Sequence, residues 1–156
     1  MEEGTLQQVT VQQVIPHEAS TVWQLTGDFG GLKNWLPGVT ECSVSGKGPR
    51  DQGGDAERAV HLMDGSITRE SLESRDESQM CYRYAILEAK GFKADQQFMA
   101  TFQVLPLADG QCEVVWTARF SVPATLSAEK VDKARQQVSQ MYQFFLAHLT
   151  TLLAAD

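Results

Sequence analysis

The side chains best suited to chemistry are an arginine and a glutamate, Arg58 and Glu70, on two strand-like segments joined by the turn Met63-Asp64-Gly65. A buried charge must be paired, and an arginine that faces a glutamate meets that requirement. Such a pair can be a fixed salt bridge that lets polar groups sit inside the protein. It can also anchor a ligand hydroxyl, carbonyl or carboxylate, with Arg58 donating and Glu70 accepting. An acid or base role for Glu70 would further require a substrate within reach.

Whether Arg58 and Glu70 face each other depends on the length of the loop that joins their strands. If Asp64-Gly65 alone form the loop, Arg69 rather than Glu70 shares the face of Arg58. If Met63-Asp64-Gly65 form it, with the glycine in the left-handed position of a type I turn and bulge, Arg58 lies opposite Glu70. The residues of the hairpin alone leave both registers open.

Aromatic residues, with one methionine, are the second signal of a binding site. Alternation along the strand-like segments places one group inward, and the three-four spacing of the last segment places another on one helix stripe. The groups are Tyr82, Tyr84, Phe98, Phe102 and Trp116 on the strands, and Met141, Tyr142 and Phe145 on the helix. Each can simply be core, but buried tyrosine hydroxyls need partners. A cavity that holds water or an apolar ligand with a polar head would supply them.

The candidate ligand-binding residues follow from these two signals. Trp35 is expected at the rim of the cavity, unless it only staples the short helical segments to the sheet. No catalytic residue and no metal ligand is assigned, because no serine, cysteine or histidine stands in a known nucleophile or metal-binding motif. The whole set is Trp35, Arg58, Val60, Leu62, Glu70, Tyr82, Tyr84, Phe98, Phe102, Trp116, Val138, Met141, Tyr142 and Phe145.

The elements that would position these residues begin with two short helices after a strand. Thr5 to Ile15 alternates apolar and polar residues, which predicts a strand, and Pro16 ends it. A short helix is predicted over His17 to Thr26. Gly30-Gly31 then breaks the chain before a second helical turn, which Pro37 ends.

The rest of the chain reads as strands and one long helix. From Val39 to Val122 the apolar residues recur at every second position, which predicts about six antiparallel strands with one covered face. After Ser127, a plausible N-cap, about 26 residues follow the spacing of an amphipathic helix. Its predicted apolar stripe is Val131, Ala134, Val138, Met141, Tyr142, Phe145, Leu149 and Leu152. This order of elements indicates an α+β fold.

Composition and charge limit the classes of partner. The 156 residues are 42% hydrophobic and 21% charged, as in a single globular domain over 1–156. A formal net charge of −7 argues against nucleic acid or an anionic membrane, since both require a basic surface. No apolar stretch is long enough to span a bilayer, and the first residues lack the hydrophobic segment of a signal peptide. Three scattered cysteines fit a cytoplasmic protein without disulfides.

Short motifs spread along the chain carry a resemblance to a known family. They are Val22-Trp23, Trp35-Leu36-Pro37-Gly38-Val39, Arg58-Ala59-Val60-His61-Leu62, Asp64-Gly65, Glu70-Ser71-Leu72, Tyr82-Arg83-Tyr84 and Val115-Trp116. In order and spacing they resemble the START-like helix-grip superfamily (SRPBCC; the bacterial type of polyketide cyclase/dehydrase and lipid-transport protein) from about Val9 to Leu153. The resemblance implies a seven-stranded antiparallel sheet wrapped around the long C-terminal helix, with a cavity between them and two short helices between strands 1 and 2. It also implies that Glu70 points inward, which favours the three-residue loop.

The resemblance and the inward residues lead to one main hypothesis and two rivals. The main hypothesis is binding of a small hydrophobic or aromatic ligand, lipid-, polyketide- or hormone-like, in the internal cavity. The alternative is a polyketide cyclase, aromatase or dehydratase in which Glu70, Arg58 or Tyr84 moves protons. The third is an interaction domain that acts through the outer face of the sheet or the terminal helix. We expect no cofactor, no nucleic acid, no integral membrane association, and a monomer or homodimer.

The state of the cavity separates these hypotheses. An open cavity with converging titratable side chains would favour an enzyme. A mostly apolar cavity with a mobile lid, expected over Glu88 to Gln96, would favour a carrier. A collapsed interior with the aromatic side chains packed together would favour an interaction domain.

Overall fold

Seven strands, two α-helices and two short 3-10 helices make up the computed structural model, which describes residues 5–91 and 97–154. The elements run β1 (Thr5–Ile15), α1 (Ala19–Thr26), η1 (Leu32–Asn34), β2 (Val39–Ser45), η2 (Arg50–Gln52), β3 (Glu57–Leu62), β4 (Ile67–Asp76), β5 (Cys81–Glu88), β6 (Phe98–Pro106), β7 (Cys112–Val122) and α2 (Ala128–Ala154). Pro16 follows the last residue of β1, as predicted. Helix α1 begins two residues later than predicted and ends at Thr26, as predicted; the N–H of the next residue, Gly27, donates to the carbonyl of Trp23 at 2.7 Å.

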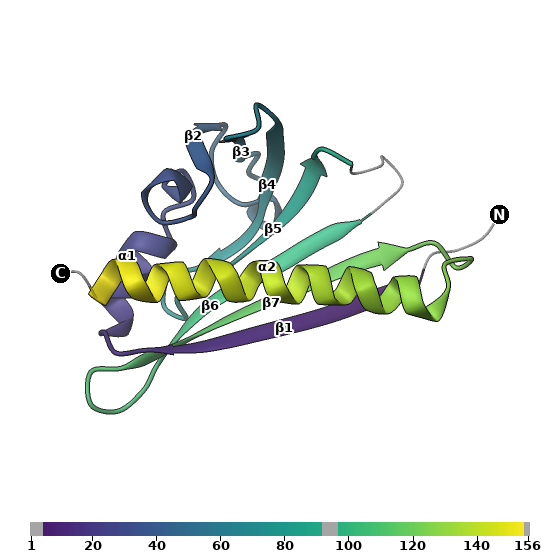
Figure 1. Cartoon of the computed structure of the whole chain (residues 1–156). Helices are drawn as coiled ribbons and strands as arrows, with labels where there is room; N and C mark the ends of the chain where they lie inside the picture. The colour runs from purple at the N-terminus through teal and green to yellow at the C-terminus, as the bar shows by residue number, and fades with distance from the viewer. Residues whose placement is uncertain (1–4, 92–96, 155–156) are drawn as a thin grey trace.

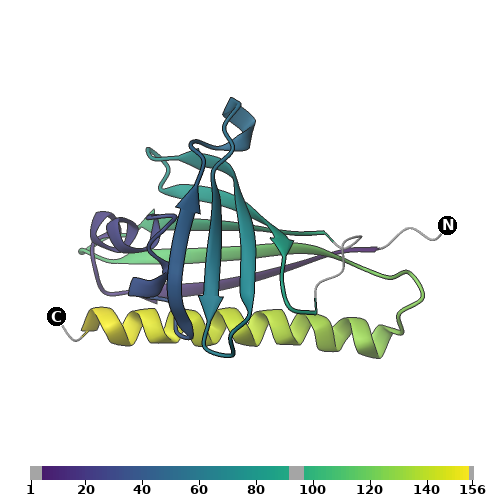
Figure 2. The ribbon, with the colours of Figure 1, turned by 90° about the horizontal axis from the view of Figure 1, so that it is seen from above.

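The strands form one antiparallel sheet in the order β1-β7-β6-β5-β4-β3-β2. Inward positions along β7 are buried at every second residue from Cys112 to Val122, which confirms the predicted alternation. Strands β1, β6 and β7 run roughly along the direction of α2, whereas β2, β3 and β4 turn across it (Figures 1 and 2). This bend leaves a concave face that a single long helix can cover, and the predicted helix-grip arrangement is confirmed.

The hairpin between β3 and β4 has the three-residue loop that brings the charged pair together. Arg58 pairs with Glu70 across the two strands. The N–H of Leu62 donates to the carbonyl of Ser66 at 2.9 Å, and the loop glycine, Gly65, has a φ of 87°. That angle lies in the left-handed region, where a residue with a Cβ is strained. The pairing of Arg58 with Glu70 and the bond from Leu62 to Ser66 establish the three-residue loop, and Gly65 supplies the left-handed conformation that this loop requires.

We expect that replacing Gly65 with alanine lowers the free energy of unfolding by about 1–2 kcal/mol, the usual cost of a left-handed conformation for a residue with a Cβ. No heavy atom lies within 4 Å of the added Cβ, so the loss comes from the backbone conformation and not from a clash. Urea denaturation would measure it. Gly65→Asn is the control, because asparagine tolerates this conformation and should recover part of the loss. An alanine variant as stable as the parent would contradict this account of the turn.

Helix α2 covers the concave face and begins at the predicted cap. The hydroxyl oxygen of Ser127 accepts a hydrogen bond from the N–H of Lys130 at 3.3 Å, as an N-cap does. The helix packs against β1 and β7. The helix runs across the whole molecule, and strands β2 to β4 cross its direction (Figure 2).

The buried line of α2 differs from the predicted stripe. Its fully buried residues are Tyr142, Leu146, Leu149 and Leu153. Met141 and Leu152 were predicted to be on the stripe, but they are 41% and 37% exposed. The reason is geometric: at 3.6 residues per turn the spacing 142, 146, 149, 153 stays on one line, whereas Met141 and Leu152 lie on its flank.

Candidate functional site

An internal pocket of about 160 Å³ lies between the bent part of the sheet and the middle of α2. Strands β3, β4 and β5 build one wall, β6 and β7 contribute one aromatic side chain each, and α2 and the η1 region close the other side. From the candidate set, the wall contains Arg58, Val60, Leu62, Glu70, Tyr82, Tyr84, Phe98, Trp116, Met141, Tyr142 and Phe145. These residues come from six elements, β3 to β7 and α2, and the inward parity of the strands brings those of the sheet together.

Three candidates lie outside the pocket wall. Trp35 is not at a rim: it is 1% exposed, and its ring packs against Phe102 and Trp116 with centroids 5.6 and 5.9 Å apart. It therefore staples the η1 region to the sheet, the second of the two roles considered for it. Phe102 is fully buried beneath the same cluster. Val138 lies one turn of α2 before the pocket and packs against the core only partly buried.

Four wall residues were missed by the sequence reasoning. Leu32 and Leu36 come from the η1 region, where a single helical turn has too few residues to define a face. Thr68 lies opposite Val60. The register with the three-residue loop therefore already places Thr68 on the inward face, and it could have been predicted. Ile86 has the same parity as the two pocket tyrosines of β5 and was readable from the alternation.

The guanidinium of Arg58 is held on all sides. The residue is 2% exposed, Nε donates to Oε1 of Glu70 at 2.7 Å, and Nη1 donates to the carbonyl of Phe29 at 3.0 Å. The centre of the guanidinium lies 4.3 Å from the ring centroid of Phe29 and 4.8 Å from that of Tyr84. Burial is the largest influence and disfavours the charged form, but the Glu70 carboxylate together with Tyr82 and Tyr84 outweighs it and raises the pKa of Arg58 above its usual range. Arg58 is thus a permanent, paired cation.

The tyrosines next to this ion pair are hydrogen-bond donors at neutral pH. Burial raises the pKa of Tyr84 and of Tyr142, and the negative charge of Glu70 raises both further. Tyr142 stacks on Trp116 with centroids 4.1 Å apart and 8° between the planes. The Nε1–H of Trp116 donates to the hydroxyl of Tyr84 at 3.3 Å. The hydroxyl of Tyr142 is buried and makes no hydrogen bond of good geometry with the described residues, although the Tyr84 hydroxyl lies near enough to lower its pKa in part.

These contacts give the pocket one polar corner in an otherwise apolar wall. The corner combines a compensated charge pair, Arg58 and Glu70, with two neutral hydroxyl donors. A buried donor without a partner is costly, so the Tyr142 hydroxyl is a position where a ligand atom or a water would be stabilised. The arrangement can orient a small apolar molecule by one polar atom.

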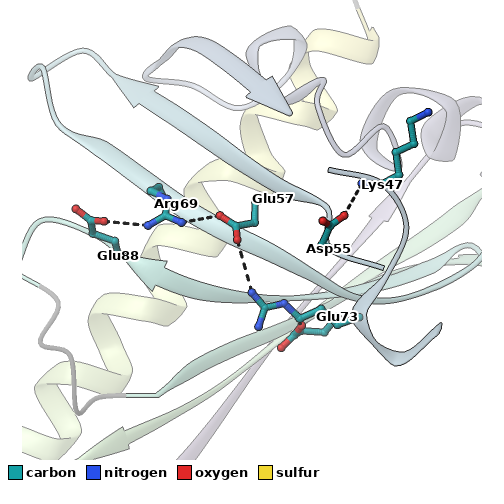
Figure 3. Close-up of polar contacts among 7 residues, drawn as sticks. Lys47, Asp55, Glu57, Arg69, Glu73 and Glu88 are labelled. Atoms are coloured by element: carbon teal, nitrogen blue, oxygen red, sulfur yellow. Dashed lines mark hydrogen bonds and ion pairs between the residues drawn. The ribbon is translucent and has the colours of Figure 1, made fainter. Parts of the chain in front are cut away.

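The opposite face of the same strands carries a separate set of ion pairs (Figure 3). Glu57, next to Arg58 in β3, points outward and pairs with Arg69 and Arg50. Arg69 also pairs with Glu88, and Arg50 pairs with Glu73. These side chains are mostly in contact with solvent, so each pair contributes little to stability. They do not border the pocket.

The described residues do not favour a metal site or a cysteine nucleophile. Across residues 5–91 and 97–154 no cluster of three or more His, Cys, Asp or Glu side chains is arranged to hold a metal ion. Burial raises the pKa of Cys42, Cys81 and Cys112, which disfavours the nucleophilic thiolate. Neither of the described helices is long and apolar enough to cross a membrane.

Solved structures of similar shape come from several bacteria. An uncharacterized protein from Bacillus thuringiensis is 26% identical, with a TM-score of 0.76, over 93% of this chain and 97% of its own. A protein from Thermobifida fusca is 25% identical, with a TM-score of 0.73, over 92% and 90%. The Zhui aromatase/cyclase from Streptomyces sp. R1128 is 16% identical, with a TM-score of 0.70, over 97% and 93%. That last likeness is one of fold alone.

Sequence comparison agrees with the likeness in shape. A search of curated proteins found no match. The profile of the family described as polyketide cyclase / dehydrase and lipid transport matches residues 7–154, which is nearly the whole chain. The strand order, the long C-terminal helix and the pocket beneath it are the features that such a match leads one to expect. The chain therefore belongs to the polyketide cyclase / dehydrase and lipid transport family.

Proposed function

We propose that this protein binds a small hydrophobic or aromatic molecule in the pocket between the sheet and α2. The observation that carries the proposal is the buried Tyr142 hydroxyl, which lacks a partner among the described residues and belongs to an otherwise apolar pocket wall. A well-packed core does not leave a donor unpaired next to empty space. A ligand with one polar atom would fill the space and use the donor.

The volume of the pocket limits the ligand to about one ring. A cavity of about 150 Å³ lined by aliphatic and aromatic side chains holds benzene, and this pocket has about 160 Å³. Pockets for drug-sized ligands have roughly 300–1,000 Å³, so a lipid or a molecule of several rings would require α2 or the rim to move. Binding energy would come from the apolar area that the ring buries against Trp116, Phe98 and the leucines of the wall.

An enzymatic role is the second candidate, because titratable side chains meet at the polar corner. Arg58, Glu70 and Tyr142 all line this pocket, and Arg58 and Glu70 are hydrogen-bonded at 2.7 Å. The two tyrosines stay protonated at neutral pH, so a base role would fall to Glu70. For any substrate found to be turned over, unchanged turnover in Glu70→Gln would rule out Glu70 as the acid or base.

Native mass spectrometry of the purified protein is the first test, followed by extraction of any bound molecule. The structure-based test uses phenol as the probe and calorimetry as the measurement. We expect Thr68→Phe to weaken phenol binding at least about tenfold, because the added ring would occupy the pocket that Thr68 borders. Thr101→Phe is the matched control, since Thr101 lies between two inward residues of β6 and points to the outer face. Equal phenol binding by both variants would argue against this pocket as the site.

The free cysteines indicate the cellular compartment of the protein, and its net charge indicates the class of its partner. Cys42, Cys81 and Cys112 are all free, which is usual for a cytoplasmic protein, and we place the protein there as a monomer or homodimer. The formal net charge of −7 favours an uncharged small molecule over nucleic acid as the partner. The lid expected over Glu88 to Gln96 lies partly outside the described residues, at 92–96, and plays no part in the proposal.

A further inference from the structure

We infer that the pocket selects a neutral ligand with a hydrogen-bond acceptor, a hydroxyl or carbonyl oxygen on a single ring, over a carboxylate of the same size. The inference rests on the proposed function, since it names the chemical class that the same pocket takes. It follows from two observations. The charges of Arg58 and Glu70 already balance each other, and the polar group left without a partner is the Tyr142 hydroxyl, which can donate a hydrogen bond.

The formal charges in the pocket wall cancel. Of the described residues that line the pocket, Arg58 and Glu70 carry formal charges, and they are paired at 2.7 Å. The side chain of Arg58 is 1% exposed and that of Glu70 is 11% exposed, so the pair is screened little by solvent. A ligand carboxylate at this corner would leave water and approach the carboxylate of Glu70, and like charges at short range disfavour each other. A neutral ligand meets neither penalty.

The guanidinium of Arg58 is already partly engaged. Its Nε is used by Glu70 and its Nη1 by the Phe29 carbonyl, and the rings of Phe29 and Tyr84 lie against the guanidinium. A carboxylate bound through two parallel hydrogen bonds needs two free nitrogens on one edge of the guanidinium. The bond from Nε to Glu70 closes the Nε/Nη2 edge to a second carboxylate, and one N–H of Nη1 is used by the Phe29 carbonyl, so two of the five N–H donors are already taken. The pairing with Glu70 therefore limits what Arg58 can offer a ligand carboxylate.

The polar group left without a partner is a hydroxyl that can donate. The hydroxyl of Tyr142 is buried, stays protonated, and has no acceptor among the described residues. The nearby hydroxyl of Tyr84 already accepts from Trp116. A ligand oxygen that accepts a hydrogen bond, as a phenol oxygen or an aryl ketone does, would use the O–H of Tyr142 as its donor. A pure hydrocarbon ring would fill the volume and leave the donor unpaired.

Two pairs of probes test the inference at pH 7. Acetophenone and benzoate have nearly the same shape but differ in charge, and we expect acetophenone to bind at least about tenfold more tightly. Phenol and toluene share a shape and differ in the acceptor. We expect Tyr142→Phe to weaken phenol about 3- to 10-fold, the usual effect of one neutral hydrogen bond, and to leave toluene unchanged. Calorimetry would measure all four dissociation constants.

A charge variant provides the sharper test. Glu70→Gln keeps the acceptor for Arg58 but leaves its positive charge uncompensated, so benzoate should gain at least about tenfold relative to acetophenone. Glu57→Gln is the matched control: it removes one carboxylate from the adjacent residue of β3, on the outer face, and should leave the ratio unchanged. Urea denaturation checks that each variant is folded.

The outcomes separate the inference from the proposed function. Benzoate binding as tightly as acetophenone, or equal effects of Glu70→Gln and Glu57→Gln on their ratio, would overturn the inference while the pocket remained a binding site. Binding of phenol with no binding of either larger probe would mean that volume sets the limit, and would overturn the charge argument. If none of the four probes bound, the proposed function and this inference would both fail.

Discussion

Replacing Glu70 with leucine should lower the free energy of unfolding by about 3–5 kcal/mol, the usual effect of removing one partner of a buried ion pair. Arg58 would then be a cation in an apolar interior, 2% exposed, with the Phe29 carbonyl as its remaining acceptor. It cannot escape this cost by losing its proton, because an arginine stays charged in proteins. Urea denaturation of the parent and the variant would measure the difference.

The double variant Arg58→Met, Glu70→Leu distinguishes this cause from a loss of packing. Removing both charges and keeping the volume should recover most of the stability, because apolar replacement of a whole buried pair is often neutral or favourable. Glu57→Leu, on the outer face beside Arg58, should cost less than about 1 kcal/mol. A loss as large in Glu57→Leu, or no recovery in the double variant, would show that burial of Arg58 is not what makes Glu70 necessary.

The sheet was predictable from sequence because one of its faces is buried and the other is in contact with solvent, so apolar and polar residues alternate along the strands. In β7 every second residue from Cys112 to Val122 is buried, and a period of two over so many residues has no helical reading. The hairpin register was harder, since the residues around Asp64-Gly65 allow two loops that differ by one position. Both loops place Gly65 at positive φ, and they differ at Asp64, which the two-residue loop would also place there but which has a negative φ. The sequence does not show that angle, so the resemblance to a family with an inward glutamate was needed to choose.

The helix and the pocket were less predictable, for a physical reason. A stripe of apolar residues identifies a helix, but not which side of the stripe contacts the sheet, so Leu146 and Leu153 were missed and Leu152 was included wrongly. Inward parity places a side chain on the concave face but cannot tell packed core from pocket wall. Phe102 and Phe98 have the same parity in β6, yet the first is core and the second borders the pocket. Empty volume depends on how side chains fit, which no single position encodes.

Replacing Trp116 with alanine should both destabilise the protein and change the size of ligand that the pocket accepts. The indole stacks on Tyr142 at 4.1 Å and contacts the ring of Phe102 at 5.1 Å, so its loss should cost about 3–5 kcal/mol, as for other buried tryptophans. The indole is also part of the pocket wall, and its removal would join its own volume to the existing space. The ligand 2-naphthol, which has one ring too many for the present pocket, should then bind at least about tenfold more tightly than to the parent.

Val114→Ala is the matched control for this last prediction, because Val114 lies on the same strand and face, is fully buried, and does not border the pocket. It should lower stability without admitting 2-naphthol, whereas Trp116→Leu, a milder change, should lie between the parent and the alanine variant in both measurements. If Val114→Ala admitted 2-naphthol as well as Trp116→Ala did, general loosening of the core would explain the gain. If stability fell in Trp116→Ala and 2-naphthol affinity did not rise, Trp116 would be core support and not the side chain that limits ligand size. The combination of lost stability and gained affinity at one residue is expected only where a wall of the binding pocket is also part of the core.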